Sequence, residues 1–125
     1  MLAAALVLAA AWPAAAQDTL QPRVQDGKFV MRDGEGIYKN VCQACHMADA
    51  KGAQGSGKYP ALAADPRLAA AAYPIQVVIH GQKGMPPFGA YFDDDQIAAV
   101  IGYVRTHFDN HYAGAVKAED VHALR

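Results

Sequence analysis

The sequence has little net charge, few cysteines and few large apolar side chains. In its 125 residues, eleven Lys and Arg stand against twelve Asp and Glu, so the formal net charge is -1. A chain with this net charge lacks the excess of basic residues that is typical of nucleic-acid-binding proteins. The length suffices for one domain and is short for two of ordinary size.

The scarcity of cysteine and of bulky apolar residues narrows the structural class further. Two cysteines exclude a disulfide-rich scaffold and a zinc site made of four thiolates. Hydrophobic residues make up 53% of the chain, but 27 residues are alanine, which adds little bulk to a core. We therefore expect something other than the side chains to supply part of the core volume.

The first 16 residues, MLAAALVLAAAWPAAA, carry no charge and are almost wholly apolar. They end in three alanines, the small-x-small pattern that signal peptidase accepts. They are also shorter than the roughly 20 residues that span a bilayer as a helix. We interpret residues 1–16 as a cleaved signal peptide and expect a periplasmic protein; an uncleaved membrane anchor is the alternative.

The middle of the chain is expected to be mostly helical with long loops. An Asp-Gly pair predicts a small hairpin over residues 24–30. Asp33 is placed to cap a helix over residues 34–44. A short helix is expected over residues 67–72, closed by Pro74, because proline interrupts helices.

The C-terminal part carries the clearest helical pattern. An apolar stretch over residues 75–80 is stopped by Gly81. Asp93 with Gln96 three residues later has the pattern of a capping box, which predicts a helix that begins there. One further helical turn is expected from Ala118. The apolar face of the capped helix follows the i, i+3, i+4, i+7 spacing at Ile97, Val100, Ile101 and Val104.

Five consecutive residues, Cys42-Gln43-Ala44-Cys45-His46, carry most of the functional information. C-x-x-C-H is the attachment sequence of c-type haem. Cys42 and Cys45 lie one helical turn apart on one face, so their sulfurs can form thioethers with the two haem vinyl groups. His46 follows directly and can act as the proximal iron ligand.

Other uses of the two cysteines fit less well. A thioredoxin-like C-x-x-C motif would follow a strand, whereas a helix is expected here. A zinc site would need more ligands at suitable spacing, and a disulfide between residues three apart in a helix is strained. Covalently bound haem c is therefore the predicted cofactor, with a thiol-redox or zinc-binding module as the alternative.

Met85 is the predicted second axial ligand. It stands in Gly-Met-Pro-Pro-Phe, where the glycine permits close approach of the backbone and the prolines stiffen the loop. Met47 is adjacent to His46 and cannot reach the opposite haem face, and Met31 lies in the N-terminal segment. His80 is the remaining candidate, since Met and His both serve as axial ligands.

The chain resembles class I cytochromes c over residues 33–106. Gly34 and Tyr38 precede the first cysteine by eight and four residues, as in the family's Gly-x-x-x-aromatic-x-x-x-Cys pattern. The resemblance implies that both pack against an aromatic on the C-terminal helix, a position that Tyr103 matches beside Val100.

The same resemblance implies a second contact and a fold. Pro60-Ala61-Leu62 matches the family's Pro-x-Leu, which implies a hydrogen bond from His46 to the Pro60 carbonyl, with Leu62 packed at the haem. The implied fold is all-α: three to five helices wrapped around one covalently attached haem. The implied domain covers residues 17–125, with a haem core at about 33–106 and a tail at 107–125.

A narrower resemblance concerns the segment from Gly84 to Asp94. Its Met-Pro-x-Phe pattern, with Phe88 as the aromatic, is similar to that of small cytochrome subunits of flavocytochrome dehydrogenases of the 4-cresol dehydrogenase and eugenol hydroxylase type. This implies redox partner proteins, among them a flavin-dependent dehydrogenase subunit.

The predicted function is electron transfer rather than catalysis. With His46 and Met85 both on iron, no coordination position is open, and the chain has no activated nucleophile, no paired carboxylates and no phosphate loop. We expect a monohaem carrier that accepts electrons from a dehydrogenase and passes them to another carrier or an oxidase. The alternative is a haem enzyme or gas sensor with an open sixth position.

Overall fold

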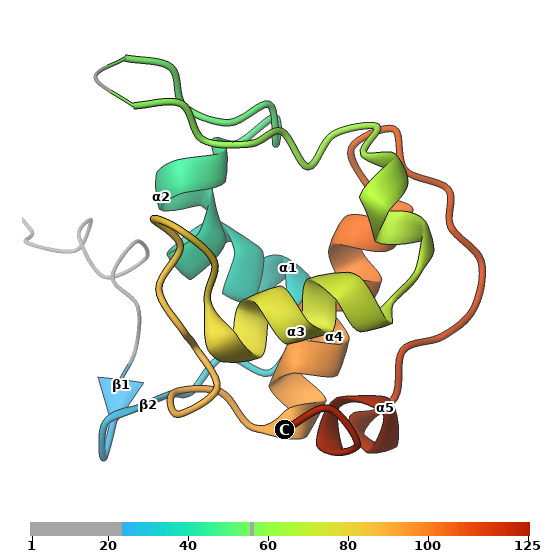
Figure 1. Ribbon diagram of the computed structural model, residues 1–125. Coiled ribbons are helices and arrows are strands. Elements are labelled where there is room, and N and C mark those ends of the chain that lie inside the picture. Colours follow the sequence, from blue (N-terminus) through green and yellow to red (C-terminus); the bar gives the residue numbers. More distant parts are fainter. Residues whose placement is uncertain (1–23, 56) are drawn as a thin grey trace, which may run out of the picture.

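A computed structural model describes residues 24–55 and 57–125 of the chain (Figure 1). The signal peptide expected over residues 1–16 lies outside these residues. Between 24 and 125, with residue 56 excepted, no helix has the length and apolar character to cross a membrane. The elements are β1 Val24–Gln25, β2 Lys28–Phe29, α1 Gly34–Ile37, the π-helical turn η1 Tyr38–Cys42, α2 Gln43–His46, the 3-10 helix η2 Pro66–Ala69, α3 Ala72–His80, α4 Asp94–Thr106 and α5 Ala118–His122.

The small N-terminal hairpin is confirmed. β1 pairs antiparallel with β2, and Asp26 and Gly27 between them have φ of 51° and 76°, as a two-residue turn of the mirror-image type requires. Phe29 packs the hairpin against the helical part of the protein: its ring stacks on that of Phe92, with the ring centroids 4.8 Å apart. The Phe29 carbonyl also accepts a hydrogen bond from the buried amide of Gln96 at 2.7 Å.

The first helical segment begins where the sequence predicts. The Asp33 carboxylate accepts a hydrogen bond from the backbone N–H of Gly36 at 2.6 Å, which caps the helix. α1, η1 and α2 follow one another without a break, so the segment ends at His46, two residues beyond the expected end. Met47, with φ of 66°, ends it.

The expected short helix over residues 67–72 is wrong in its bounds. A 3-10 turn occupies Pro66–Ala69, and α3 begins at Ala72 with Pro74 inside its first turn. N–H groups in a first helical turn have no partner within the helix, so proline costs little there and does not close a helix. The stop at Gly81 is confirmed: it has φ of 74° and donates to Val77 at 2.9 Å.

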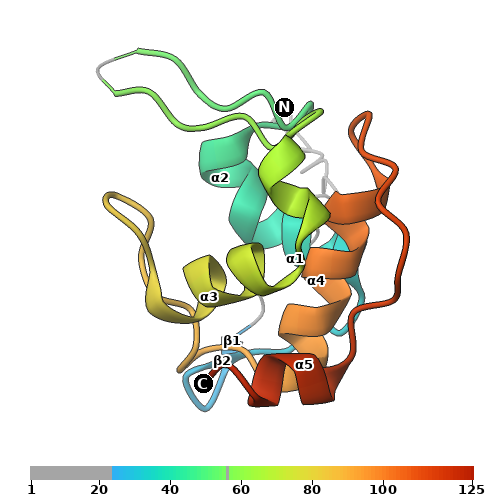
Figure 2. The same cartoon turned by 45° about the vertical axis from the view of Figure 1, so that its right-hand side comes forward.

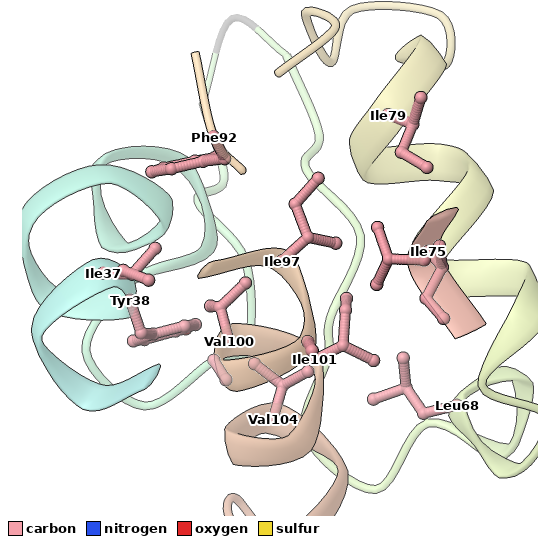
Figure 3. Packing of buried hydrophobic residues seen from close by; sticks show 13 residues of the cluster. Ile37, Tyr38, Leu68, Ile75, Ile79, Phe92, Ile97, Val100, Ile101 and Val104 are labelled. Atoms are coloured by element: carbon pink, nitrogen blue, oxygen red, sulfur yellow. The ribbon is translucent and has the colours of Figure 1, made fainter. Parts of the chain in front are cut away.

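α4 is the central element of the core, and its capping box is confirmed. The Asp93 carboxylate accepts from the N–H of Gln96, and the Gln96 side chain accepts from the N–H of Asp93, both at 2.9 Å. Figure 3 shows the apolar side chains of α4 lying between two groups. Ile37 and Tyr38 cover one side, and the other side is covered by Leu68, Ile75 and Ile79.

α1 approaches α4 very closely, and glycine is the reason that it can. A Cβ atom at Gly34 would lie 2.2 Å from the carbonyl oxygen of Ala99 and 2.7 Å from the Cβ of Tyr103. One turn further on, Tyr38 is 1% exposed and packs on Tyr103 with ring centroids 5.8 Å apart. The packing of both positions against the α4 aromatic, which the family resemblance implied, is confirmed.

The C-terminal residues return along α4 and end near its beginning (Figure 2). The helical turn expected from Ala118 is confirmed as α5, which packs on α4. Val121 in α5 is fully buried. Residues 107–125 are therefore part of the packed body, and the mostly helical architecture expected from the sequence is confirmed.

Candidate haem site

The two cysteines are placed by the helical segment that runs from Gly34 to His46. Cys42 ends η1, Cys45 lies in α2, and both are free cysteines that are partly buried as whole residues. Burial of the sulfur raises the pKa of Cys42 to about 12, so this thiol is neutral at neutral pH. A neutral thiol is a poor nucleophile, which argues against the thiol-redox interpretation. Among residues 24–55 and 57–125, no group of three or more His, Cys, Asp or Glu side chains is arranged to hold a metal ion.

His46 is the last residue of α2 and is 7% exposed. Its Nδ1 lies 3.1 Å from the carbonyl oxygen of Pro60, so the hydrogen bond that the resemblance implied is present. Burial lowers the pKa of the imidazole below its ordinary value, so the ring is neutral at neutral pH. With Nδ1–H donating to Pro60, the lone pair of Nε2 is left for a metal ion.

Pro60 reaches His46 because the chain after the motif folds back on α2. The N–H groups of Gly52 and Ala53 donate to the carbonyls of His46 and Cys45, both at 3.0 Å. Gly52 has φ of 78°, and a Cβ there would lie 2.2 Å from the Tyr59 carbonyl oxygen. Only glycine meets both demands, so Gly52 sets the path that brings Pro60 to the imidazole.

The stretch that follows Pro60 is fastened by a residue from the tail. Asn110 is 1% exposed, and its amide donates to the carbonyls of Leu62 and Val104, both at 2.8 Å. Its side-chain oxygen accepts from the N–H of Asp65 at 3.0 Å. Sequence reasoning missed Asn110, because a single asparagine after a helix belongs to no functional pattern.

Tyr38 supports the helix end at which His46 lies. Its hydroxyl donates to the carbonyl of Met47 at 2.8 Å, and its ring packs on Tyr103 and Phe108. Burial raises the pKa of the phenol, so Tyr38 stays neutral and keeps donating. The hydrogen bond fixes the residue that follows His46 and so limits how the imidazole can tilt.

Met85 lies in the loop between α3 and α4, and its side chain is partly buried. Its backbone exchanges two hydrogen bonds with Gln82, at 3.0 and 2.9 Å, which closes a tight turn. A Cβ at Gly81 would lie 2.7 Å from the Met85 carbonyl oxygen, so this loop too depends on a glycine. In Figures 1 and 2 the loop lies on the same side of the molecule as α2.

The remaining candidates are placed differently. His80 is exposed, and its Nε2 lies 3.3 Å from the carbonyl oxygen of Leu124. Met47 is 37% exposed, and Met31 packs against the core beside the hairpin. Phe88 is partly buried, with its ring centroid 5.8 Å from that of Phe92.

The donor set therefore fits a covalently attached haem. Two free thiols lie on neighbouring helical turns, a neutral imidazole offers a free Nε2, and a thioether stands on a closed loop. Together with the mostly helical fold and its close α1–α4 crossing, this set defines a c-type cytochrome.

The comparison with known families agrees with that class. Residues 29–104 match the family described as cytochrome c oxidase, cbb3-type, subunit III, and the chain belongs to this family. It follows that the chain carries haem c and transfers electrons through it.

Two curated relatives are cytochrome subunits of dehydrogenases. The chain is 32% identical over 108 residues to the fructose dehydrogenase cytochrome subunit of Gluconobacter japonicus, covering 74% of this chain and 22% of the relative. It is 30% identical over 106 residues to the gluconate 2-dehydrogenase cytochrome c subunit of Pantoea cypripedii, covering 74% and 24%. The chain thus spans less than a quarter of each relative. The expected likeness to dehydrogenase cytochrome subunits is confirmed.

Proposed function

We propose that the protein is a periplasmic one-electron carrier whose single haem c is attached through Cys42 and Cys45 and ligated by His46 and Met85. The observation that carries the proposal is the His46 imidazole, which directly follows the two cysteines and is held by Pro60 at 3.1 Å. This bond commits Nδ1 as a donor and leaves Nε2 as the ligating atom.

Three features of the chain suit it to hold an axial imidazole without movement. Nδ1–H of His46 remains bonded to the Pro60 carbonyl, which itself is positioned by the Gly52 turn. Tyr38 fixes the backbone immediately after His46. Because these contacts come from backbone and from a buried phenol, the ring needs little rearrangement when an electron arrives or leaves.

The Met85 loop supports the second ligand in the same way. The paired hydrogen bonds with Gln82 and the close fit at Gly81 restrict the backbone from which the thioether projects. Bound haem supplies a one-electron Fe(III)/Fe(II) couple, whose potential methionine ligation raises. A loop that keeps its thioether in place leaves no open position, which favours a carrier over a gas sensor or an oxygen-activating enzyme.

The partner proposal rests on the two relatives and on the N-terminal sequence. Both relatives are cytochrome subunits of dehydrogenases, so we propose that this carrier accepts electrons from a dehydrogenase. The resemblance of residues 84–94 to small cytochrome subunits of flavocytochrome dehydrogenases supports a flavin-dependent subunit as the donor. The electrons would pass to a downstream carrier or an oxidase. The interpretation of residues 1–16 as a cleaved signal peptide supports the periplasm as the compartment of this exchange.

Visible spectra of the haem-loaded protein test the ligand set. The wild type should be low-spin in both redox states, show the weak far-red band of a methionine–iron bond when oxidised, and not respond to CO when reduced. Met85→Ala should lose the far-red band and gain CO binding, whereas His80→Ala, the matched control, should keep the wild-type spectra. A high-spin or CO-binding wild type would contradict the carrier proposal and support the sensor or enzyme alternative.

A further inference from the structure

The loop that carries Met85 is closed at its base on the end of α3. We define the Met85 loop as residues 81–87. The chain that leaves it returns to α3, where the N–H of Phe88 donates to Val78 at 2.8 Å and the N–H of Gly89 donates to Ile79 at 3.2 Å. These two hydrogen bonds set the point at which the chain returning from the loop meets α3.

The last residues of the described chain contact both ends of this base. On the returning side, the guanidinium of Arg125 donates to the carbonyls of Gly89 at 2.6 Å and Phe92 at 2.9 Å. Its Nε donates to the Asp94 carboxylate at 2.5 Å. On the outgoing side, Nε2 of His80, the last residue of α3, lies 3.3 Å from the Leu124 carbonyl oxygen.

Arg125 packs closely against the backbone at Gly89, and α5, which precedes it in the chain, is packed on the core. A Cβ at Gly89 would lie 2.9 Å from the Ile79 carbonyl oxygen and 3.4 Å from Nη1 of Arg125. α5 is held against the body by Val121, which is fully buried, and the Arg125 side chain is 31% exposed. Figure 1 shows the C-terminus beside the orange segment that precedes α4.

We propose that Arg125 is a positioning residue for the Met85 ligand, acting through the backbone of residues 89–92. The proposal rests on the proposed function, in which Met85 ligates iron. A ligand loop exchanges between closed and open states, and contacts made only in the closed state lower the open population. The guanidinium of Arg125 is charged, and hydrogen bonds from a charged donor are stronger than those between neutral groups.

The test compares variants at position 125 in the haem-loaded full chain. Arg125→Met keeps the apolar stem and removes every donor, and Arg125→Ala serves as a second variant. His122→Ala is the matched control, because His122, the last residue of α5, lies three residues before Arg125 and contacts Asp94 at 3.3 Å, with no bond to the carbonyls of Gly89 or Phe92.

The first readout is the affinity of the oxidised protein for imidazole, which binds iron only after methionine has left. Both Arg125 variants should bind imidazole about tenfold more tightly, since the open population rises by that factor. The control should stay within about twofold of the wild type. The second readout is amide hydrogen exchange at Phe88 and Gly89, which should become faster in the Arg125 variants and stay unchanged at Ile101 in α4.

The outcomes separate this proposal from the one on which it rests. Unchanged imidazole affinity and unchanged exchange in Arg125→Met would overturn the positioning role. So would a lower global unfolding midpoint without a change in either local readout, because that marks a merely structural contact. A wild type without the far-red band would contradict Met85 ligation itself, and the exchange rates at Phe88 and Gly89 would then still decide whether Arg125 holds the loop.

Discussion

The crossing of α1 over α4 provides a sharp test of the packing, because a single methyl group at Gly34 should disturb it. In Gly34→Ala, the added Cβ would lie 2.2 Å from the Ala99 carbonyl oxygen and 2.7 Å from the Tyr103 Cβ. Neither atom can rotate away, since the Ala99 oxygen belongs to the backbone and the Tyr103 Cβ is bonded directly to its own Cα. Ordinary contact begins at about 3.5 Å, so α1 must withdraw from α4 by about 1 Å.

That displacement should cost about 2 kcal/mol of unfolding free energy. Overpacking in a core costs about 1–3 kcal/mol, and the better helix propensity of alanine returns at most about 1 kcal/mol. α1 also carries Ile37 and continues directly into Tyr38 of η1. These residues are 0% and 1% exposed, so their packing on α4 loosens as well. For a domain of this size the melting temperature should fall by about 10 °C.

Chemical denaturation of the haem-loaded protein, followed by far-ultraviolet circular dichroism and by haem absorbance, measures this change. The matched control is Gly102→Ala, the same substitution within α4, where an added Cβ meets no atom within 4 Å. It should stabilise the protein by about 0.5–1 kcal/mol, because glycine is unfavourable inside a helix. Equal stability of Gly34→Ala and the wild type would refute the argument from close approach.

Three further predictions concern substitutions of single residues. Gly52→Ala should lower the yield of haem-loaded protein, measured as haem absorbance per protein, because the φ of 78° and the Tyr59 carbonyl at 2.2 Å both exclude a side chain. Asn110→Ala should cost about 2–4 kcal/mol in urea unfolding, since it leaves the buried carbonyl of Val104, the part-buried carbonyl of Leu62 and the N–H of Asp65 without the Asn110 partner. The hydrogen bond from Arg125 holds the pKa of Asp94 below its ordinary value, so this pair stabilises the fold above about pH 4 and its contribution is lost as pH falls through the lowered pKa. Asp94→Asn should therefore flatten the acid side of the stability profile, by less than about 1 kcal/mol because the pair is solvent-exposed.

Helix starts were predictable from the sequence where the capping contacts are local. Asp33 bonds the N–H of Gly36, and Asp93 and Gln96 bond each other, all within three residues. The bounds of α3 were not predictable in this way. Pro74 looks the same in the sequence whether it opens or closes a helix. In the structure it stands in the first turn of α3, next to Ile75, which is buried in the core.

In the candidate site, too, the features made by neighbouring residues were predictable and those made by distant residues were not. The attachment motif and the glycine and prolines around Met85 are contiguous, so their chemistry is visible in the sequence. The contact between His46 and Pro60 was accessible only through a family resemblance, because its two atoms are brought together by the turn at Gly52. The roles of His46 and Met85 as haem ligands, and of Pro60 as the support of His46, remain predictions; the spectra described above test the ligand set.

The amino-acid sequence by itself determined the attachment motif and the capped helices, because each depends on residues a few positions apart. The tertiary structure decided what the tail does. Asn110 reaches back to Leu62 and Arg125 to Gly89, across separations that no periodic pattern records. Hydrogen bonds between such distant residues depend on where the packed helices place them, and only the fold carries that information.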